Sequence, residues 1–121
     1  MTISGHGHRF ERVAEEINHE VSLMLAGELK DPRLAGSVSV TEVRVSPDLG
    51  TVRVYVQIAG EPNERAAALE GLKAASGFVR HELVERLQLR RAPEVLFQLD
   101  ESEEYGQHID DLLRQTRGPK E

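Results

Sequence analysis

The sequence predicts an α+β fold in which helices cover one side of a small three-stranded sheet. Three observations support this. Apolar residues recur at helical spacing in two long segments, valines alternate with polar residues in a central block, and a third alternating run follows Pro93. Because these elements come in blocks, a two-layer sandwich is the expected packing. At 121 residues the chain is expected to hold one domain.

The first predicted helix spans residues 10–29. Its apolar residues follow the 3.6-residue period, and most of its glutamates lie elsewhere around the helix. We expect it to end before Asp31-Pro32, because a residue that precedes proline is steered away from helical geometry. Residues 1–9 lack periodicity and are expected to form a flexible N-terminus, whose two histidines do not make a selective metal site.

A β-hairpin is predicted over residues 38–58. The second strand alternates strictly, with Val52, Val54, Val56 and Ile58 on one face. In the first strand the alternation changes phase between Val40 and Val43. A β-bulge near Thr41-Glu42 explains this, because one extra residue turns the second pair of valines inward again. Pro47, Asp48 and Gly50 are typical of the turn between the strands.

Two short helices are predicted to meet at a kink, Ala75-Ser76-Gly77. One apolar stripe continues on both sides of the kink: Leu69, Leu72, Ala75, Val79, Leu83 and Leu87. Glycine costs about 1 kcal/mol relative to alanine inside a helix. We expect Ser76 to cap the second helix by accepting from the N–H of residue 78 or 79. With Arg80 in its first turn, such a helix start would attract a phosphate.

A second interpretation of the kink stays open. Small residues at Ser76 and Gly77 also let two helices cross closely, and both interpretations can hold together. Phe78 is expected in the core, although Phe78 and Tyr55 have the ring surfaces on which RNA bases stack.

After the kinked helices, a third strand is predicted from Val95 to Leu99, with Val95 and Phe97 facing one way and Leu96 the other. Asp100 and Glu103 predict the cap of a C-terminal helix over residues 101–116. We therefore expect a domain over residues 10–100, followed by this helix and a flexible tail at 117–121.

Charge and composition narrow the possible functions. The net charge is −6, but residues 100–121 alone hold seven acidic and three basic side chains. Between Leu72 and Arg91 five basic side chains face two acidic ones, which predicts a basic patch on an acidic protein, or else arginines that only solvate a helix. No apolar run approaches the roughly 20 residues that span a bilayer. Without cysteine or a secretory signal, we expect a cytoplasmic protein.

Signatures of catalysis are missing from the sequence. No phosphate-binding glycine loop and no Gly-x-Ser-x-Gly motif occur, and His19, His81 and His108 lack the HExxH spacing of metal hydrolases. We expect no enzyme activity, no cofactor and no bound metal.

Ordered motifs give the chain a resemblance to the ribosome-binding factor A family. They are Arg12-Val13, Leu29–Leu34, Val38–Leu49, Val54–Val56, Ala75–Arg80, Leu87–Pro93 and Phe97–Asp100. The resemblance implies a type II K-homology (KH) fold in the order α-β-β-α-α-β, with an Ala-x-Gly kink in place of the usual Gly-x-x-G loop. That replacement favours recognition of structured ribosomal RNA over generic single strands.

The same resemblance implies a function in ribosome biogenesis. Its members bind the free small (30S) ribosomal subunit and assist late maturation and processing of 16S rRNA, including the 5'-terminal helix region. They support growth in the cold and have no catalytic activity. We expect a monomer whose partners are the small subunit and its rRNA. Two alternatives are a protein-interaction module and a general single-stranded RNA-binding KH-like domain.

The residues expected to bind RNA are mostly basic. Around the kink they are Lys73, Ser76, Gly77, Arg80, Arg86, Arg90 and Arg91. A possible extension of this surface comprises Lys30, Arg33, Arg44 and Arg53. Binding through these side chains would be largely electrostatic and would weaken steeply as salt rises.

Overall fold

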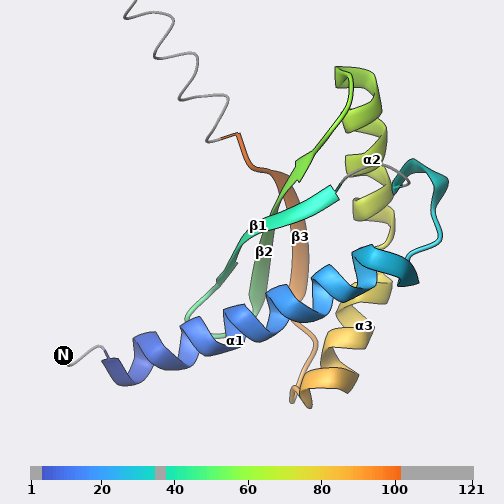
Figure 1. Ribbon diagram of the computed structural model, residues 1–121. Helices are drawn as coiled ribbons and strands as arrows, with labels where there is room; N and C mark the ends of the chain where they lie inside the picture. The colour runs from blue at the N-terminus through green and yellow to red at the C-terminus, as the bar shows by residue number, and fades with distance from the viewer. Residues whose placement is uncertain (1–3, 35–37, 102–121) are drawn as a thin grey trace, which may run out of the picture.

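The computed structural model describes residues 4–34 and 38–101. Along this part of the chain, helices and strands follow one another in the predicted order α-β-β-α-α-β (Figure 1). Their bounds are α1 Ser4–Leu23, η1 Met24–Glu28, η2 Pro32–Leu34, β1 Val38–Val45, β2 Thr51–Ile58, α2 Pro62–Ala74, α3 Ser76–Leu87 and β3 Glu94–Leu99. The α+β fold is thereby confirmed.

The sheet has the strand order β1-β2-β3, with β2 in the middle. β1 pairs antiparallel with β2, and β3 pairs parallel with β2 from Thr51↔Glu94 to Val56↔Leu99. The predicted bulge is confirmed, because the register of β1 shifts between Val40 and Glu42 and leaves Thr41 unpaired. The Thr41 hydroxyl donates to the carboxylate of Asp100, which follows β3.

Helices cover only one face of this sheet (Figure 1). Alternation along β2 sends every second side chain into the core, so Val52, Val54 and Val56 are buried while Arg53 and Gln57 are exposed. The core also takes side chains from the helices and from β3: Ile17, Val21, Met24, Ala68, Leu72, Val79, Leu83, Val95 and Phe97. The opposite face of the sheet has no helix against it within the described residues.

The first helix differs from its prediction at both ends. α1 begins at Ser4 rather than Phe10, so it overlaps the N-terminus that we expected to be flexible. It is regular to Leu23 and then widens into one π-helical turn, η1, in which the N–H of Leu29 donates to the carbonyl oxygen of Met24 at 3.0 Å. The helical segment still ends before Asp31-Pro32, as the proline requires.

α2 begins at Pro62, within a capping box. The Glu61 side chain accepts from the N3 amide, and the Glu64 side chain accepts from the Glu61 N–H at 2.7 Å. Further along, buried Gly71 contacts the link between η1 and β1. A Cβ on Gly71 would lie 3.2 Å from Asp31 Oδ2 and 3.3 Å from Leu34 Cδ2, so any larger residue would require these side chains to move by a few tenths of an ångström.

The predicted C-terminal helix over 101–116 and the tail at 117–121 lie outside the described residues, apart from Glu101. Within residues 4–34 and 38–101, none of the helices combines the length and the apolar composition that crossing a bilayer requires.

Candidate RNA-binding surface

A single residue, Ala75, separates α2 from α3. Its φ and ψ of −87° and −2° stay near helical values, so the helix axis is interrupted without a loop. The prediction that Ser76 caps α3 is wrong, because its hydroxyl donates backward to the carbonyl oxygen of Lys73 at 2.7 Å. The N–H of Val79 donates to the Ala75 carbonyl at 3.0 Å and is therefore not available to a ligand.

The outer side of the kink is open to solvent. Gly77 is exposed, and a Cβ built there would meet no atom within 4 Å. Close crossing of the helices thus does not explain this glycine. Phe78, which we expected in the core, is 45% exposed. The reason is its position, since it precedes buried Val79 by one residue and so projects about 100° away from the apolar stripe.

Two basic residues, Lys73 and Arg80, share this open side, and Arg90 and Arg91 lie in the loop that Arg80 contacts. Lys73, Gly77 and Arg80 follow one another at four and three residues, a spacing that places them on one helical face. Arg80 Nη2 donates to the carbonyl oxygen of Ala92 at 3.3 Å, which directs the guanidinium toward the loop that carries Arg90 and Arg91. Within the described residues none of the four forms an ion pair. We call this set the helical surface: Lys73, Gly77, Phe78, Arg80, Arg90 and Arg91.

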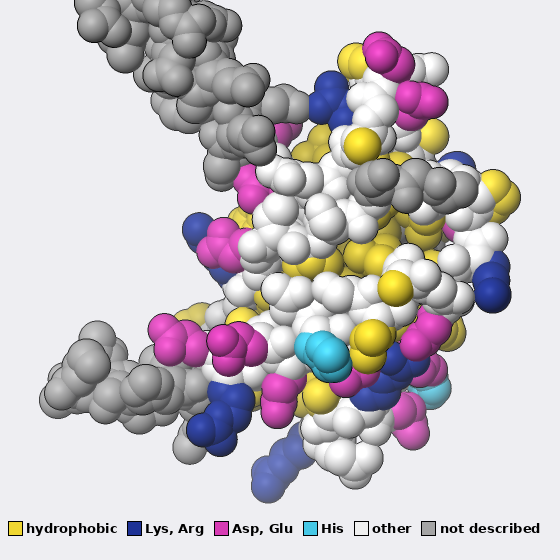
Figure 2. Space-filling model, viewed as in Figure 1, with side chains coloured by type: hydrophobic (Ala, Val, Ile, Leu, Met, Phe, Trp, Pro, Cys, Tyr) yellow, Lys and Arg dark blue, Asp and Glu magenta, His cyan; other side chains and the backbone are white. Residues whose placement is uncertain are grey.

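Arg86 lies apart from the helical surface. Its guanidinium donates to the carboxylates of Glu28, Glu20 and Glu82, with the last two at 3.2 Å and 3.1 Å. The hydrogen bonds that Arg86 donates to Glu28 and Glu20 raise its pKa above the ordinary value. Figure 2 shows Lys or Arg and Asp or Glu side chains intermingled over α3. Arg86 therefore ties α3 to α1 and η1 and is left out of the candidate surface, contrary to its prediction.

Two further candidates lie in the link between η1 and β1. Arg33 Nη2 is 2.6 Å from Asp31 Oδ2, and this hydrogen-bonded pair lowers the pKa of Asp31 and raises that of Arg33. Lys30 is exposed nearby in the sequence. Of the two, only Lys30 keeps its charge free of an ion pair within the described residues.

Arg44 and Arg53 do not extend the helical surface. Because their neighbours Val43, Val54 and Val52 point toward the helices, both arginines project from the opposite face of the sheet. In the sequence, Arg44 and Arg53 are grouped with the kink because of their charge alone. In the structure the sheet lies between these two arginines and the helical surface.

A hollow of about 580 Å³ borders the helical surface at Arg90 and Arg91. Its apolar lining comes from α1, from the ends of β1 and β2 with the turn between them, and from the loop after α3, and includes Val13, Ile17, Val45, Leu49, Val52, Leu89 and Pro93. The acidic side chain of Asp48 also lines it. Leu49 and Gln88, the non-glycine residues with positive φ in the described chain, both line it. Such a hollow beside two arginines can take the apolar face of a base or ribose while the cations hold the phosphate.

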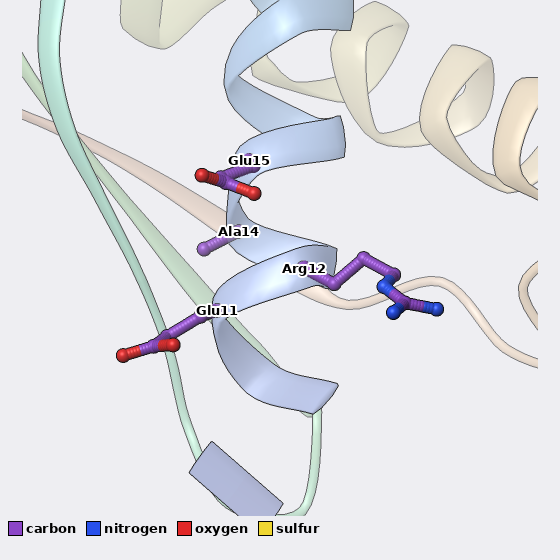
Figure 3. Close-up of a pocket in the computed structure, with 4 residues that line it drawn as sticks. All are labelled: Glu11, Arg12, Ala14 and Glu15. Carbon is purple, nitrogen blue, oxygen red and sulfur yellow. The ribbon is translucent and has the colours of Figure 1, made fainter. Parts of the chain in front are cut away.

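The outer side of α1 is different in charge. A hollow there is lined by Glu11, Arg12, Ala14 and Glu15, which all come from one helix (Figure 3). In Figure 3 the two glutamates point to one side and Arg12 to the other. Because acidic side chains outnumber the basic one, this hollow does not favour phosphate.

Sequence reasoning misplaced one residue of this region, Phe78, and missed another, Gly71. The exposure of Phe78 could have been predicted, since it falls between the stripe positions 75 and 79. The contact between Gly71 and the Asp31–Leu34 link had no local signal, because it joins segments that are about 40 residues apart in the chain.

Comparison with known proteins identifies the family of this chain. The family model of ribosome-binding factor A matches residues 9–113. A ribosome-binding factor A of Acetivibrio thermocellus is 49% identical over 108 residues, which cover 89% of this chain and 88% of the relative. One from a Synechococcus species is 50% identical over 119 residues, covering 93% and 85%.

Solved structures of the same name share the fold. The crystal structure of ribosome-binding factor A from Thermus thermophilus has a TM-score of 0.66 and 27% identity, covering 74% of this chain and 93% of that one. A solution structure of a putative ribosome binding factor A from Thermotoga maritima has a TM-score of 0.65 and 34% identity, covering 74% and 85%. This chain therefore belongs to the ribosome-binding factor A family.

Proposed function

We propose that this protein binds the free small (30S) ribosomal subunit and assists late maturation and processing of 16S rRNA, including the 5'-terminal helix region. It acts in the cytoplasm as a monomer, supports growth in the cold and catalyses no reaction. Membership of the family supports this assignment. So does a Thermus thermophilus ribosome binding factor A homology model fitted to the map of a 30S complex, which resembles this chain with a TM-score of 0.53 and 28% identity, covering 71% of this chain and 93% of that one.

The observation that carries the proposal is the composition of the helical surface. An exposed phenylalanine lies at the kink among cations that form no ion pairs within the described residues, whereas Arg86 on the same helix is held by three carboxylates. Cations outside ion pairs can neutralise phosphates, and an exposed ring can stack on an unpaired base. Arg80 and the 88–93 loop are joined by a hydrogen bond, so their charges are presented together.

Charge reversal at Arg80 and Arg90 tests this proposal. We expect the doubly reversed variant to lose co-sedimentation with free 30S subunits. The slope of log affinity against log salt is expected to fall by about one unit for each phosphate contact removed. Arg12→Glu is the matched control, because Arg12 is an exposed arginine of α1 outside the helical surface.

Three outcomes would contradict the proposal. If the doubly reversed protein sediments with 30S subunits as well as the parent does, the helical surface is not the interface. Association that survives digestion of the RNA would favour a protein-interaction module. Equal affinity for unstructured oligonucleotides and assembled subunits would favour a general single-stranded RNA-binding protein.

A further inference from the structure

The open face of the sheet carries two like charges directly opposite each other. Arg44 on β1 and Arg53 on β2 are register partners, and both are exposed. Directly opposed like charges destabilise an antiparallel pair. A position that breaks a local rule in this way is a candidate for function.

The two arginines differ in their partners. Arg44 Nε donates to Glu42 at 2.8 Å, and its guanidinium carbon lies 5.5 Å from the centre of the Tyr55 ring. Arg53 makes no hydrogen bond or ion pair with the residues that the structure describes. Arg44 is thus compensated and oriented, while Arg53 keeps its full charge beside it.

A hollow of about 290 Å³ lies at this pair. It is lined by Arg44, Val45, Ser46, Thr51, Arg53 and Tyr55. Ser46 Oγ is already engaged, because it accepts from the N–H of Thr51 at 2.9 Å and donates to Asp48. The hydroxyls of Thr51 and Tyr55 make no hydrogen bond within the described residues and remain able to meet a ligand.

Acidic side chains also lie on this face, but they do not line the hollow. Glu42 is paired with Arg44, and Glu94 lies opposite Thr51 in the parallel ladder. The hollow itself therefore holds two cations and two hydroxyls, a donor set suited to an anion.

We propose that this hollow binds a phosphate of single-stranded RNA between Arg44 and Arg53, with the adjoining base against Arg44 and Tyr55. Arginine planes and tyrosine rings are surfaces on which unpaired bases stack. The inference rests on the proposed function for the identity of the ligand. Since the hollow and the helical surface lie on opposite sides of the sheet, one molecule would hold two RNA segments at once.

The test measures binding of a short unstructured oligoribonucleotide by fluorescence anisotropy over a range of salt concentrations. We expect Arg53→Gln to weaken binding several-fold and to lower the salt slope by about one unit, and Arg12→Gln to change neither. Both measurements are repeated with Arg80 and Arg90 already reversed. Independent sites give the same fold-change in that background, so this inference can stand or fall apart from the proposed function.

The variant Glu42→Gln is expected to bind the oligoribonucleotide more tightly, a result that a misfolded protein cannot produce. Removing this carboxylate leaves two uncompensated arginines at the hollow, so we expect tighter binding. Unchanged or weaker binding by this variant, or full binding by Arg53→Gln, would overturn the proposal.

Two further ligands define the chemistry of the site. If inorganic phosphate displaces the oligoribonucleotide at equal concentration, the site binds anions in general and does not recognise the nucleotide. If an acidic peptide binds as tightly as the oligoribonucleotide, RNA is not its ligand. We expect both to bind more weakly than the oligoribonucleotide.

Discussion

The helix pair α2–α3 has a buried side, whose apolar packing stabilises the fold, and an exposed side, which is open to a partner. On the buried side, Leu72, Val79 and Leu83 are fully enclosed and pack against the sheet. On the exposed side, Gly77 and Phe78 have room around them. Removal of apolar area from water stabilises the first side, while the second leaves apolar and charged groups in solvent that a partner can cover.

Two arginines of α3 show the same division. Arg86 is surrounded by carboxylates from three elements, whereas Arg80 makes one hydrogen bond to a backbone carbonyl. Both are arginines on one helix, yet the first holds the fold together and the second is available to a phosphate. The role of each arginine therefore follows from the side chains around it in space, and not from its residue type or its position in the sequence.

The largest expected effect comes from the buried side. Leu72→Ala should lower the free energy of unfolding by about 2–5 kcal/mol, because a fully enclosed side chain leaves a cavity. Phe78→Ala on the exposed side should change it by no more than about 0.5 kcal/mol, yet weaken RNA binding. Urea unfolding and 30S co-sedimentation of both variants give the comparison. Equal losses of stability would show that Phe78 is packed after all.

A smaller effect is expected at Arg86. Arg86→Gln should lower the melting temperature, because Glu20, Glu28 and Glu82 are left to repel one another. Added salt should reduce the loss by screening the carboxylates. The matched variant Arg80→Gln should keep the melting temperature and lower the salt slope of RNA binding instead. If thermal scans and binding assays instead showed a loss of stability for Arg80→Gln and a loss of RNA binding for Arg86→Gln, the roles of the two arginines would be reversed.

The two glycines of the helix pair should respond with opposite signs. Gly71→Ala should destabilise by about 1–3 kcal/mol, because its Cβ would press on Asp31 and Leu34. Gly77→Ala should stabilise by about 0.4–1 kcal/mol, since its Cβ meets open space and alanine has less freedom in the unfolded chain. Urea midpoints of the two variants decide this. A loss at position 77 would mean that the kink needs glycine for its backbone.

The smallest effect concerns acid stability at the hairpin turn. The pKa of Asp48 is lowered by the Gly50 N–H and the Ser46 hydroxyl, and to a lesser degree by Arg91. Because the folded pKa lies below the ordinary 3.8, the stabilisation is present above that pH and is lost as pH falls through the folded pKa. Asp48→Asn should therefore be less stable than the parent at pH 6, and the difference should shrink near pH 3. If the difference in stability between Asp48→Asn and the parent did not depend on pH, it would come from the geometry of the turn and not from the charge of Asp48.

Much of the fold was predictable because its signals are local. The alternation along β2, the phase change at Thr41, Pro62 at a helix start and the kink at Ala75-Ser76-Gly77 each act within a few residues. Other features were not predictable. The π-helical turn after Leu23, the parallel pairing of β3 with β2 and the enclosure of Gly71 depend on segments that meet only in the folded chain.

For the candidate site, the sequence by itself determined the inventory of charges and the kink that interrupts α2–α3. Only the tertiary structure decided which cations are free. It neutralised Arg86 with glutamates from α1 and η1 and turned Arg44 and Arg53 to the far side of the sheet. The physical reason is that electrostatic pairing depends on distance in space, and carboxylates nearly 60 or more residues away in the chain lie within hydrogen-bonding distance of Arg86.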